Sequence, residues 1–475
     1  MRVHTRSSIA CILAALLAVR AAFGQEAIPT PPNPFRVRSE YTPPPAMPAW
    51  PGAARSIHDS SSHTVATSYS LDDLLRLASS NNPTLVQARA HISAELGKAL
   101  EAGLYPNPTF SYEADQIFVD SDTQKNTPGE FQGGVLEQRF VTAGKLQLSR
   151  QKYLQRAQVA ENLAMAQQFR VCNDVRIHFY RTLAADLTLA IRRELQKAAE
   201  DGAVTVRESY NLGEARRTDV RRADVTLQKA RLDLLNAENA YNEEFRKLTS
   251  LVGVPIVAGS IVGELIPQCP PVSFEEALNR LLMESPEIAA ARAKLVVDQI
   301  TVRREEVQWI PDVVVRGGSG YNFENKETVA VAGVTVEIPL YDRNQGTIQQ
   351  ARADHARQRQ EISRVELELR ERLAGTYQQY TTALQHANEY ERVILPELKA
   401  VYGELLQSYK DNRIDWAEVL MAQNDYFDAR LTQVDNLMHA RTQEVLIYGY
   451  LLSDGLKAAP GITPPGHIDA VPKPR

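Results

Sequence analysis

Few residues of this 475-residue chain have types and spacings that could do chemistry. Asp174 and His178 lie four positions apart and would share one face of a helix, while His58 and His63 flank a run of serines. Such residues can bind metal ions, but isolated pairs more often form hydrogen bonds or face water. The chain has no HExxH, GxSxG, Walker or glycine-rich dinucleotide motif. We therefore expect no catalytic residues, no metal site and no cofactor, and a protein that is not an enzyme.

The N-terminus has the pattern of an export signal. Two arginines precede the apolar run Ile9 to Val19, and the small residues Ala22 to Gly24 offer a cleavage site, so residues 1–24 are a predicted signal peptide. Cleavage would remove three arginines and move the net charge from −5 to −8, which argues against nucleic acid as a partner. Cys172 and Cys269 would remain, either as a disulfide or as two free thiols.

Two segments of the chain resemble each other. Ser70 to Ala90 reads SLDDLLRLASSNNPTLVQARA, and Ser273 to Ala293 reads SFEEALNRLLMESPEIAAARA. Each begins with a Ser-x-x-acid capping box and later places a short polar residue before proline, a pattern that suits the start of a second helix. We predict a helix pair in each copy and an internal duplication of the chain.

Strand-like segments follow both helix pairs. Residues 107–140 and 311–340 each contain alternating apolar and polar residues around a polar turn, which predicts two β-hairpins. The return segment of the first hairpin alternates poorly, so a strand is predicted there by analogy with the second. We expect the aromatic residues of one parity to face lipid or form membrane girdles, with packing in a soluble sandwich as the alternative. These residues are Phe110, Tyr112, Phe118, Tyr321 and Phe323.

Long helices are predicted after each hairpin. No proline interrupts the first, from Lys145 to about residue 199, and others are expected at about 218–252, 345–395 and 414–452. Their apolar stripes are narrow, rich in alanine and spaced as in coiled coils. Helices of this kind suit a wall one helix thick, wet on both sides.

The repeated order of elements defines the predicted domain organisation. The long helices occupy about 145–252 in the first repeat and about 345–455 in the second. The predicted segments are a signal peptide (1–24), a Pro/Ser-rich periplasmic leader (25–68), a first repeat (69–252), a linker (253–272), a second repeat (273–456) and a tail (457–475).

One chain offers only four strands to a membrane. A closed barrel needs about eight strands to fill its interior with side chains, and an open sheet in lipid would leave unpaired edges. The chain must therefore assemble with copies of itself around a symmetry axis. The predicted fold is mainly α with a β-barrel portion, in which duplicated helix pairs, β-hairpins and long helical hairpins assemble into an oligomer.

From Ser70 to about Leu456 the sequence resembles the TolC, or outer membrane efflux protein, family. The resemblance rests on the duplicated segments, the strand starts YPNPTFSYE and WIPDVVV, the strand-to-helix junctions LEQRFVTAGKLQLSRQ and VEIPLYDRNQGTIQQARA, and the helical turns YNLGEARRTDVRRADVTLQKAR and YKDNRIDWAEVLMAQNDYFDAR. It implies a homotrimer in the outer membrane with a periplasmic tunnel. Such a trimer is the passive exit duct for an inner-membrane pump joined through a periplasmic adaptor.

The junction FVTAGK resembles the cation-efflux members of this family, of the cobalt-zinc-cadmium and copper-silver kind. This resemblance suggests heavy-metal cations as the cargo, with drugs or other small molecules as the alternative.

The resemblance also places the periplasmic tips of the helical hairpins, near 210–220 and 409–420. It puts Glu418 at an acidic ring that narrows the tunnel entrance, to which Asp415 can add, and Asp219 at a closing contact. Rings of carboxylates concentrate cations and repel anions. The alternative is that Asp219 and Glu418 are simply acids in the first turn of a helix, where they favour the helix dipole.

The turn residues at the tips are predicted to be Tyr210, Gly213 and Tyr409, with Gly213 in a left-handed conformation. The chain departs from the family pattern at Ile414 and Asn412, where some members have a basic residue and a glycine. The predicted substitutes for the basic latch residue are Arg413 and Arg217.

A second hypothesis is a periplasmic coiled-coil scaffold or adaptor that never enters a membrane. The amphipathic hairpins argue against it, because a scaffold has no use for strands with an apolar face. A third hypothesis, a secreted helical enzyme, has no supporting motif in the sequence.

Overall fold

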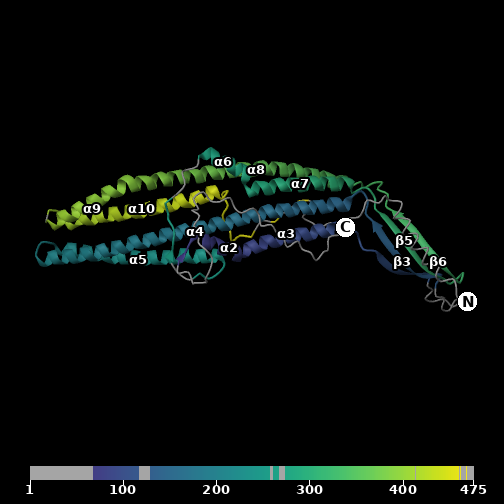
Figure 1. Ribbon diagram of the computed structural model, residues 1–475, viewed down its shortest axis with the longest axis horizontal. Helices are drawn as coiled ribbons and strands as arrows, with labels where there is room; N and C mark the ends of the chain where they lie inside the picture. The colour runs from purple at the N-terminus through teal and green to yellow at the C-terminus, as the bar shows by residue number, and fades with distance from the viewer. Residues whose placement is uncertain are drawn as a thin grey trace, which may run out of the picture. The chain divides into compact units, whose positions relative to one another are not determined.

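The computed structural model shows a mainly helical protein with one four-stranded sheet (Figure 1). Within its described part, no helix combines the length and the apolar character needed to cross a membrane. The predicted signal peptide and the leader up to residue 67 lie outside the described residues, as do His58, His63, Phe118, Cys269 and Asn412. The described residues are 68–116, 129–256, 260–266, 273–411, 413–458, 461 and 467.

Both repeated segments fold into helix pairs that begin with the predicted capping boxes. The Ser70 hydroxyl accepts the N–H of Asp73 at 3.3 Å, and the Asp73 carboxylate accepts the N–H of Ser70 at 3.2 Å. Ser273 and Glu276 exchange the same two bonds at 3.3 and 3.2 Å. The helices are α2 (Leu71–Asn81), α3 (Pro83–Ala102), α6 (Phe274–Glu284) and α7 (Pro286–Val307).

In each helix pair the second helix starts with a proline, but only one of the two starts has a side-chain capping bond. Pro83 and Pro286 both occupy the first helical turn, where the missing N–H has no cost. The Asn82 side chain accepts the N–H of Thr84 at 2.9 Å, as an N-cap should. Ser285 makes no such bond, and its buried hydroxyl has no hydrogen-bond partner among the described residues.

The long helices extend further than the sequence suggests. α4 contains 67 residues, or about 100 Å at 1.5 Å per residue, and passes the expected end near residue 199. The helix after the second hairpin was expected to end near residue 395, but it continues to Lys410. A π-helical segment, η1 (Tyr390–Ile394), lies within it just before Pro396. The long helices are α4 (Lys145–Asn211), α5 (Arg217–Val252), α8 (Gln345–Glu389), α9 (Leu395–Lys410) and α10 (Trp416–Tyr448).

These helices pack side by side with α4 in the middle (Figure 1). Early in α4, Arg156 forms an ion pair with Glu95 of α3 at 2.8 Å, and α4 also packs on α7, which packs on α8. Later, Arg192 pairs with Asp233 of α5 at 3.1 Å, and α4 packs on α10, which packs on α9. The arrangement is a wall one helix thick, with α3 and α5 on one edge and α8 and α9 on the other.

The four strands form one antiparallel sheet in the order β2-β3-β5-β6. Strand β3, predicted only by analogy, is ten residues long and pairs along its whole length with β5, from Phe131 opposite Asn322 to Phe140 opposite Val313. This pairing joins the two predicted hairpins. The strands are β2 (Thr109–Asp115), β3 (Phe131–Phe140), β5 (Val313–Asn322) and β6 (Glu327–Val336), and a separate parallel pair is formed by β1 (Ser68–Tyr69) and β4 (Ser260–Ile261).

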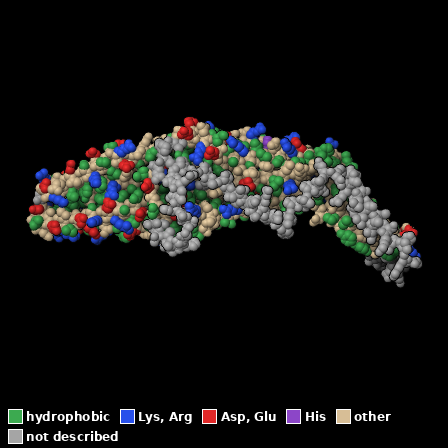
Figure 2. Space-filling model, in the orientation of Figure 1, with side chains coloured by type: hydrophobic (Ala, Val, Ile, Leu, Met, Phe, Trp, Pro, Cys, Tyr) green, Lys and Arg blue, Asp and Glu red, His purple; other side chains and the backbone are tan. Residues whose placement is uncertain are grey.

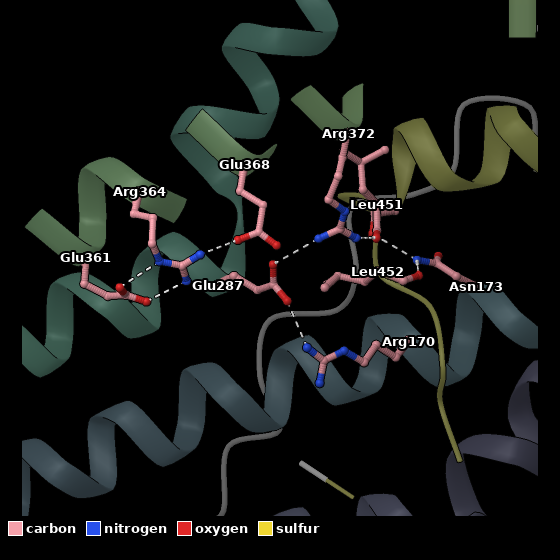
Figure 3. A network of polar contacts seen from close by, with 10 residues as sticks. Arg170, Asn173, Glu287, Glu361, Arg364, Glu368, Arg372, Leu451 and Leu452 are labelled. Atoms are coloured by element: carbon pink, nitrogen blue, oxygen red, sulfur yellow. Dashed lines mark hydrogen bonds and ion pairs between the residues drawn. The ribbon is translucent and has the colours of Figure 1, made fainter. Parts of the chain in front are cut away.

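A polar network fastens the second repeat to α4 (Figure 3). Glu287, in the first turn of α7, lies 2.9 Å from the guanidinium of Arg170 in α4 and 3.9 Å from that of Arg372 in α8. Asn173, one turn further along α4, donates to the carbonyl of Leu452 at 2.8 Å, beyond the end of α10. The centre of the wall is thus held by contacts between residues that are 85 or more positions apart.

Candidate functional site: the helical tips and the apolar face of the sheet

Each helical hairpin ends in a short turn. In the first, Gly213 has φ = 80°, a left-handed conformation that suits glycine, and the N–H of Glu214 reaches back to the carbonyl of Ser209 at 2.8 Å. Tyr210 lies in the last turn of α4 and is exposed. The second tip lies between Lys410, the last residue of α9, and Trp416, the first residue of α10.

Asp219 is used as a helix cap. It is the third residue of α5, and its carboxylate accepts the N–H of Arg216 at 3.1 Å. Asp219 therefore has the role at the start of a helix that was the alternative interpretation of this residue. A closing contact made by Asp219 between the tips stays a prediction. Arg217, one of the proposed latch residues, is exposed at the first position of α5.

The start of α10 presents two carboxylates to solvent. Asp415 occupies the N-cap position without a side-chain capping bond, Glu418 lies in the first turn, and both are exposed. Arg413, the other proposed latch residue, is exposed and pairs with Asp411 at 3.6 Å. Since Arg413 already has an acidic partner in its own turn, Asp415 and Glu418 leave a surplus of negative charge at this tip.

An aromatic pair that sequence reasoning missed closes the second tip. Tyr409 was expected as a turn residue, and it is buried with its ring edge-on to Trp416, with ring centroids 4.9 Å apart. Trp416 is the first residue of α10 and is 5% exposed. An aromatic residue directly after an Asp N-cap is the only local signal, and it does not reveal what the ring packs against.

Strand register places large apolar side chains on one face of the sheet. Figure 2 shows hydrophobic side chains gathered over the sheet, whereas charges of both signs are scattered over the helices. The opposite face is more polar and includes an ion pair between Glu113 and Arg316. Phe323 follows β5, and its ring packs on Tyr321 at 4.9 Å. The exposed residues of the apolar face are Phe110, Tyr112, Leu136, Phe140, Val315, Tyr321, Val334 and Val336.

The residues first considered for metal binding have separate protein partners. His178 Nδ1 lies 2.9 Å from Oε2 of Glu244, and Asp174 accepts the N–H of Gly455 at 2.6 Å. Burial raises the pKa of Asp174 above its usual range. The described residues contain no group of three or more His, Cys, Asp or Glu side chains that could hold a metal ion. Cys172 is a buried free thiol whose pKa is raised by burial.

A wall of long helices joined to an antiparallel sheet with one exposed apolar face is typical of a membrane channel component. The sequence profile of the outer membrane efflux proteins matches residues 74–254 and 277–451, which include both copies of the duplicated architecture. The chain belongs to the outer membrane efflux protein family.

Characterised relatives agree with this assignment. The chain is similar to the cobalt-zinc-cadmium resistance protein CzcC of Cupriavidus metallidurans, with 25% identity over 370 residues that span 76% of this chain and 84% of CzcC. Its fold is similar to that of CusC, with a TM-score of 0.69, 15% identity and coverage of 87% of this chain and 99% of CusC. The MtrE channel of Neisseria gonorrhoeae aligns with a TM-score of 0.66, 16% identity and coverage of 82% and 90%.

The protein is therefore an outer membrane channel of the tripartite efflux type, with its helical tunnel in the periplasm, and not an enzyme. Channels of this family form trimers and work with an adaptor and an inner-membrane pump. This assignment decides against the scaffold hypothesis.

Proposed function

We propose that three copies of this chain, together with a periplasmic adaptor and an inner-membrane pump, form a passive exit duct for heavy-metal cations. In this proposal Asp415 and Glu418 form the acidic ring at the periplasmic entrance. The observation that carries the proposal is the pair of exposed carboxylates at the start of α10.

The unfinished edges of the wall support assembly with further copies, and the number three is taken from the family. Among the described strands, β2 and β6 each pair on one side only, and three copies would supply twelve strands, more than the about eight that a closed barrel needs. Both helical edges also expose apolar side chains, as surfaces that meet a second copy do. On one edge these are Val86, Leu96, Leu100, Val225, Leu232 and Leu235, and on the other they are Leu367, Val393 and Val401.

The assembly is tested by the mass of the purified mature protein in detergent. We expect light scattering to give three times the polypeptide mass, and the protein to need detergent or lipid because of the apolar face of the sheet. A monomer that stays dissolved in plain buffer would contradict the proposal.

The cargo is inferred from charge and from the relative CzcC. A ring of carboxylates raises the local concentration of cations, and CzcC is named for resistance to cobalt, zinc and cadmium. Organic compounds are the second candidate. Growth of a deletion strain on metal salts and on drugs separates the two, since only sensitivity to metals supports the proposed cargo.

Glu418 is the residue through which we test the ring. For Glu418→Gln we expect the cation-to-anion permeability ratio in planar bilayers to fall about fivefold, equivalent to about 1 kcal/mol of lost Coulomb attraction. In the deletion strain this variant should restore metal tolerance less well than the wild type.

A matched control is Glu397→Gln, which removes an exposed acid from α9 away from the turn. It should leave the permeability ratio unchanged. Equal ratios for Glu418→Gln and the wild type would remove Glu418 from the entrance.

A further inference from the structure

We infer that Trp416 is a positioning residue for the channel entrance. Its indole holds the first turn of α10 against α4 by occupying a notch at Gly202, and the entrance widens when the indole leaves this notch. The inference rests on the proposed entrance at Asp415 and Glu418, because these residues flank Trp416 on the same turn.

The notch exists because residue 202 has no side chain. A Cβ atom at Gly202 would lie 2.7 Å from Cζ2 and 2.9 Å from Cη2 of the Trp416 indole, closer than carbon atoms pack. Gly202 lies in the last third of α4, within the first helical hairpin, whereas Trp416 opens the last helix of the second hairpin. The indole therefore connects the two hairpins near their tips.

The contact is reinforced from two sides. The Tyr409 ring lies edge-on to the indole at 4.9 Å, which fastens the end of α9 to the start of α10. Further from the tip, an ion pair between Arg430 of α10 and Glu194 of α4 is a second link between the hairpins. Because this pair lies well back along α10, the first turn of the helix can move while Arg430 stays attached.

The closed contact leaves polar groups unsatisfied. The indole Nε1 of Trp416 and the hydroxyl of Tyr409 are both buried and have no hydrogen-bond partner among the described residues. Burying a donor without a partner is unfavourable, and both groups would regain hydrogen bonds on reaching water. This cost offsets part of the packing energy of the rings and keeps the closed and open states close in free energy.

The second hairpin also contains a place where it can bend. Residues of η1 form wide π turns, and the following Pro396 cannot donate a backbone hydrogen bond. None of the five residues of η1 is buried, so little packing resists bending there. Movement of α9 about η1 would carry Tyr409 and the start of α10 away from α4.

Trp416→Ala and Gly202→Ala test the inference from opposite sides of the contact. We expect either change to raise single-channel conductance or open probability in planar bilayers several-fold, while the cation-to-anion permeability ratio is retained. Trp416→Phe should lie between the wild type and Trp416→Ala, since phenylalanine keeps an aromatic ring but is smaller than the indole whose Cζ2 and Cη2 atoms fill the notch. Gly403→Ala is the matched glycine control in α9, because a Cβ atom there meets nothing within 4 Å.

Wild-type conductance in assembled Trp416→Ala and Gly202→Ala channels would overturn the inference. If Trp416→Ala does not assemble, Gly202→Ala is decisive, and loss of assembly in both would show a structural role instead. The proposed entrance fails separately, because Glu418 is judged by the permeability ratio and Trp416 by the conductance.

Discussion

Replacing Glu444 with leucine is expected to lower the free energy of unfolding by about 3–5 kcal/mol, since it leaves a buried charge without its partner. Glu444 and Arg441 lie on α10 with 2% and 5% of their surfaces exposed, and the carboxylate accepts from the guanidinium at 2.6 Å. The guanidinium also lies over the ring of Tyr180 of α4, 4.8 Å from its centroid. Arg441 cannot discharge by losing a proton, so the loss of Glu444 is not compensated.

The double variant Glu444→Leu with Arg441→Met is the control for this pair. Apolar side chains of similar size often replace a buried ion pair without loss of stability, so the double variant should recover most of the lost free energy. Denaturation midpoints of the purified trimer in detergent measure both variants. A double variant as unstable as Glu444→Leu alone would contradict this account.

The same pair predicts a dependence of stability on pH. Burial raises the pKa of Glu444 above its ordinary value of 4.5, and the interaction with Arg441 only partly opposes this shift. The native state therefore holds the proton to higher pH than the unfolded state does. The contribution of Glu444 to stability is full below pH 4.5 and is lost as the pH rises through the raised pKa. Glu444→Leu should abolish this part of the pH profile.

Gly449→Ala is expected to have the second large effect, lowering the free energy of unfolding by about 3 kcal/mol. The reason is that two hydrogen bonds are broken and a buried polar group is left without a partner. A Cβ atom at Gly449 would overlap the side-chain amide of Asn173. That amide is fully buried and donates to the carbonyl of Gly449 at 2.9 Å. It also donates to the carbonyl of Leu452 at 2.8 Å (Figure 3). The substitution should displace Asn173 and loosen the end of α10 from α4.

Gly375→Ala in α8 separates this clash from the general effect of adding a methyl group to glycine. A Cβ atom at Gly375 meets nothing within 4 Å, and alanine should stabilise a helix interior by about 0.5–1 kcal/mol. Denaturation midpoints that move equally in the Gly449 and Gly375 variants would argue against the predicted overlap.

The sequence by itself determined the features that depend on neighbouring residues. The capping boxes at Ser70 and Ser273 join groups three residues apart, so the residue types are sufficient to predict them. Gly213 takes its left-handed turn for a similarly local reason. Alternation along the strands predicted their apolar parity, because successive side chains of a strand point to opposite faces. The duplication then supplied the order of elements in both halves.

Only the tertiary structure decided which distant residues meet. The pairing of β3 with β5, the position of Gly449 against Asn173 and the insertion of Trp416 at Gly202 all join residues from different halves of the chain. Contacts of this kind leave no periodic signal, because each depends on how two helices or strands are placed and not on the residues beside them. The end of α4 was misjudged near residue 199 for the same reason. Gly202 weakens a helix by local propensity, but packing of the Trp416 indole requires a glycine there.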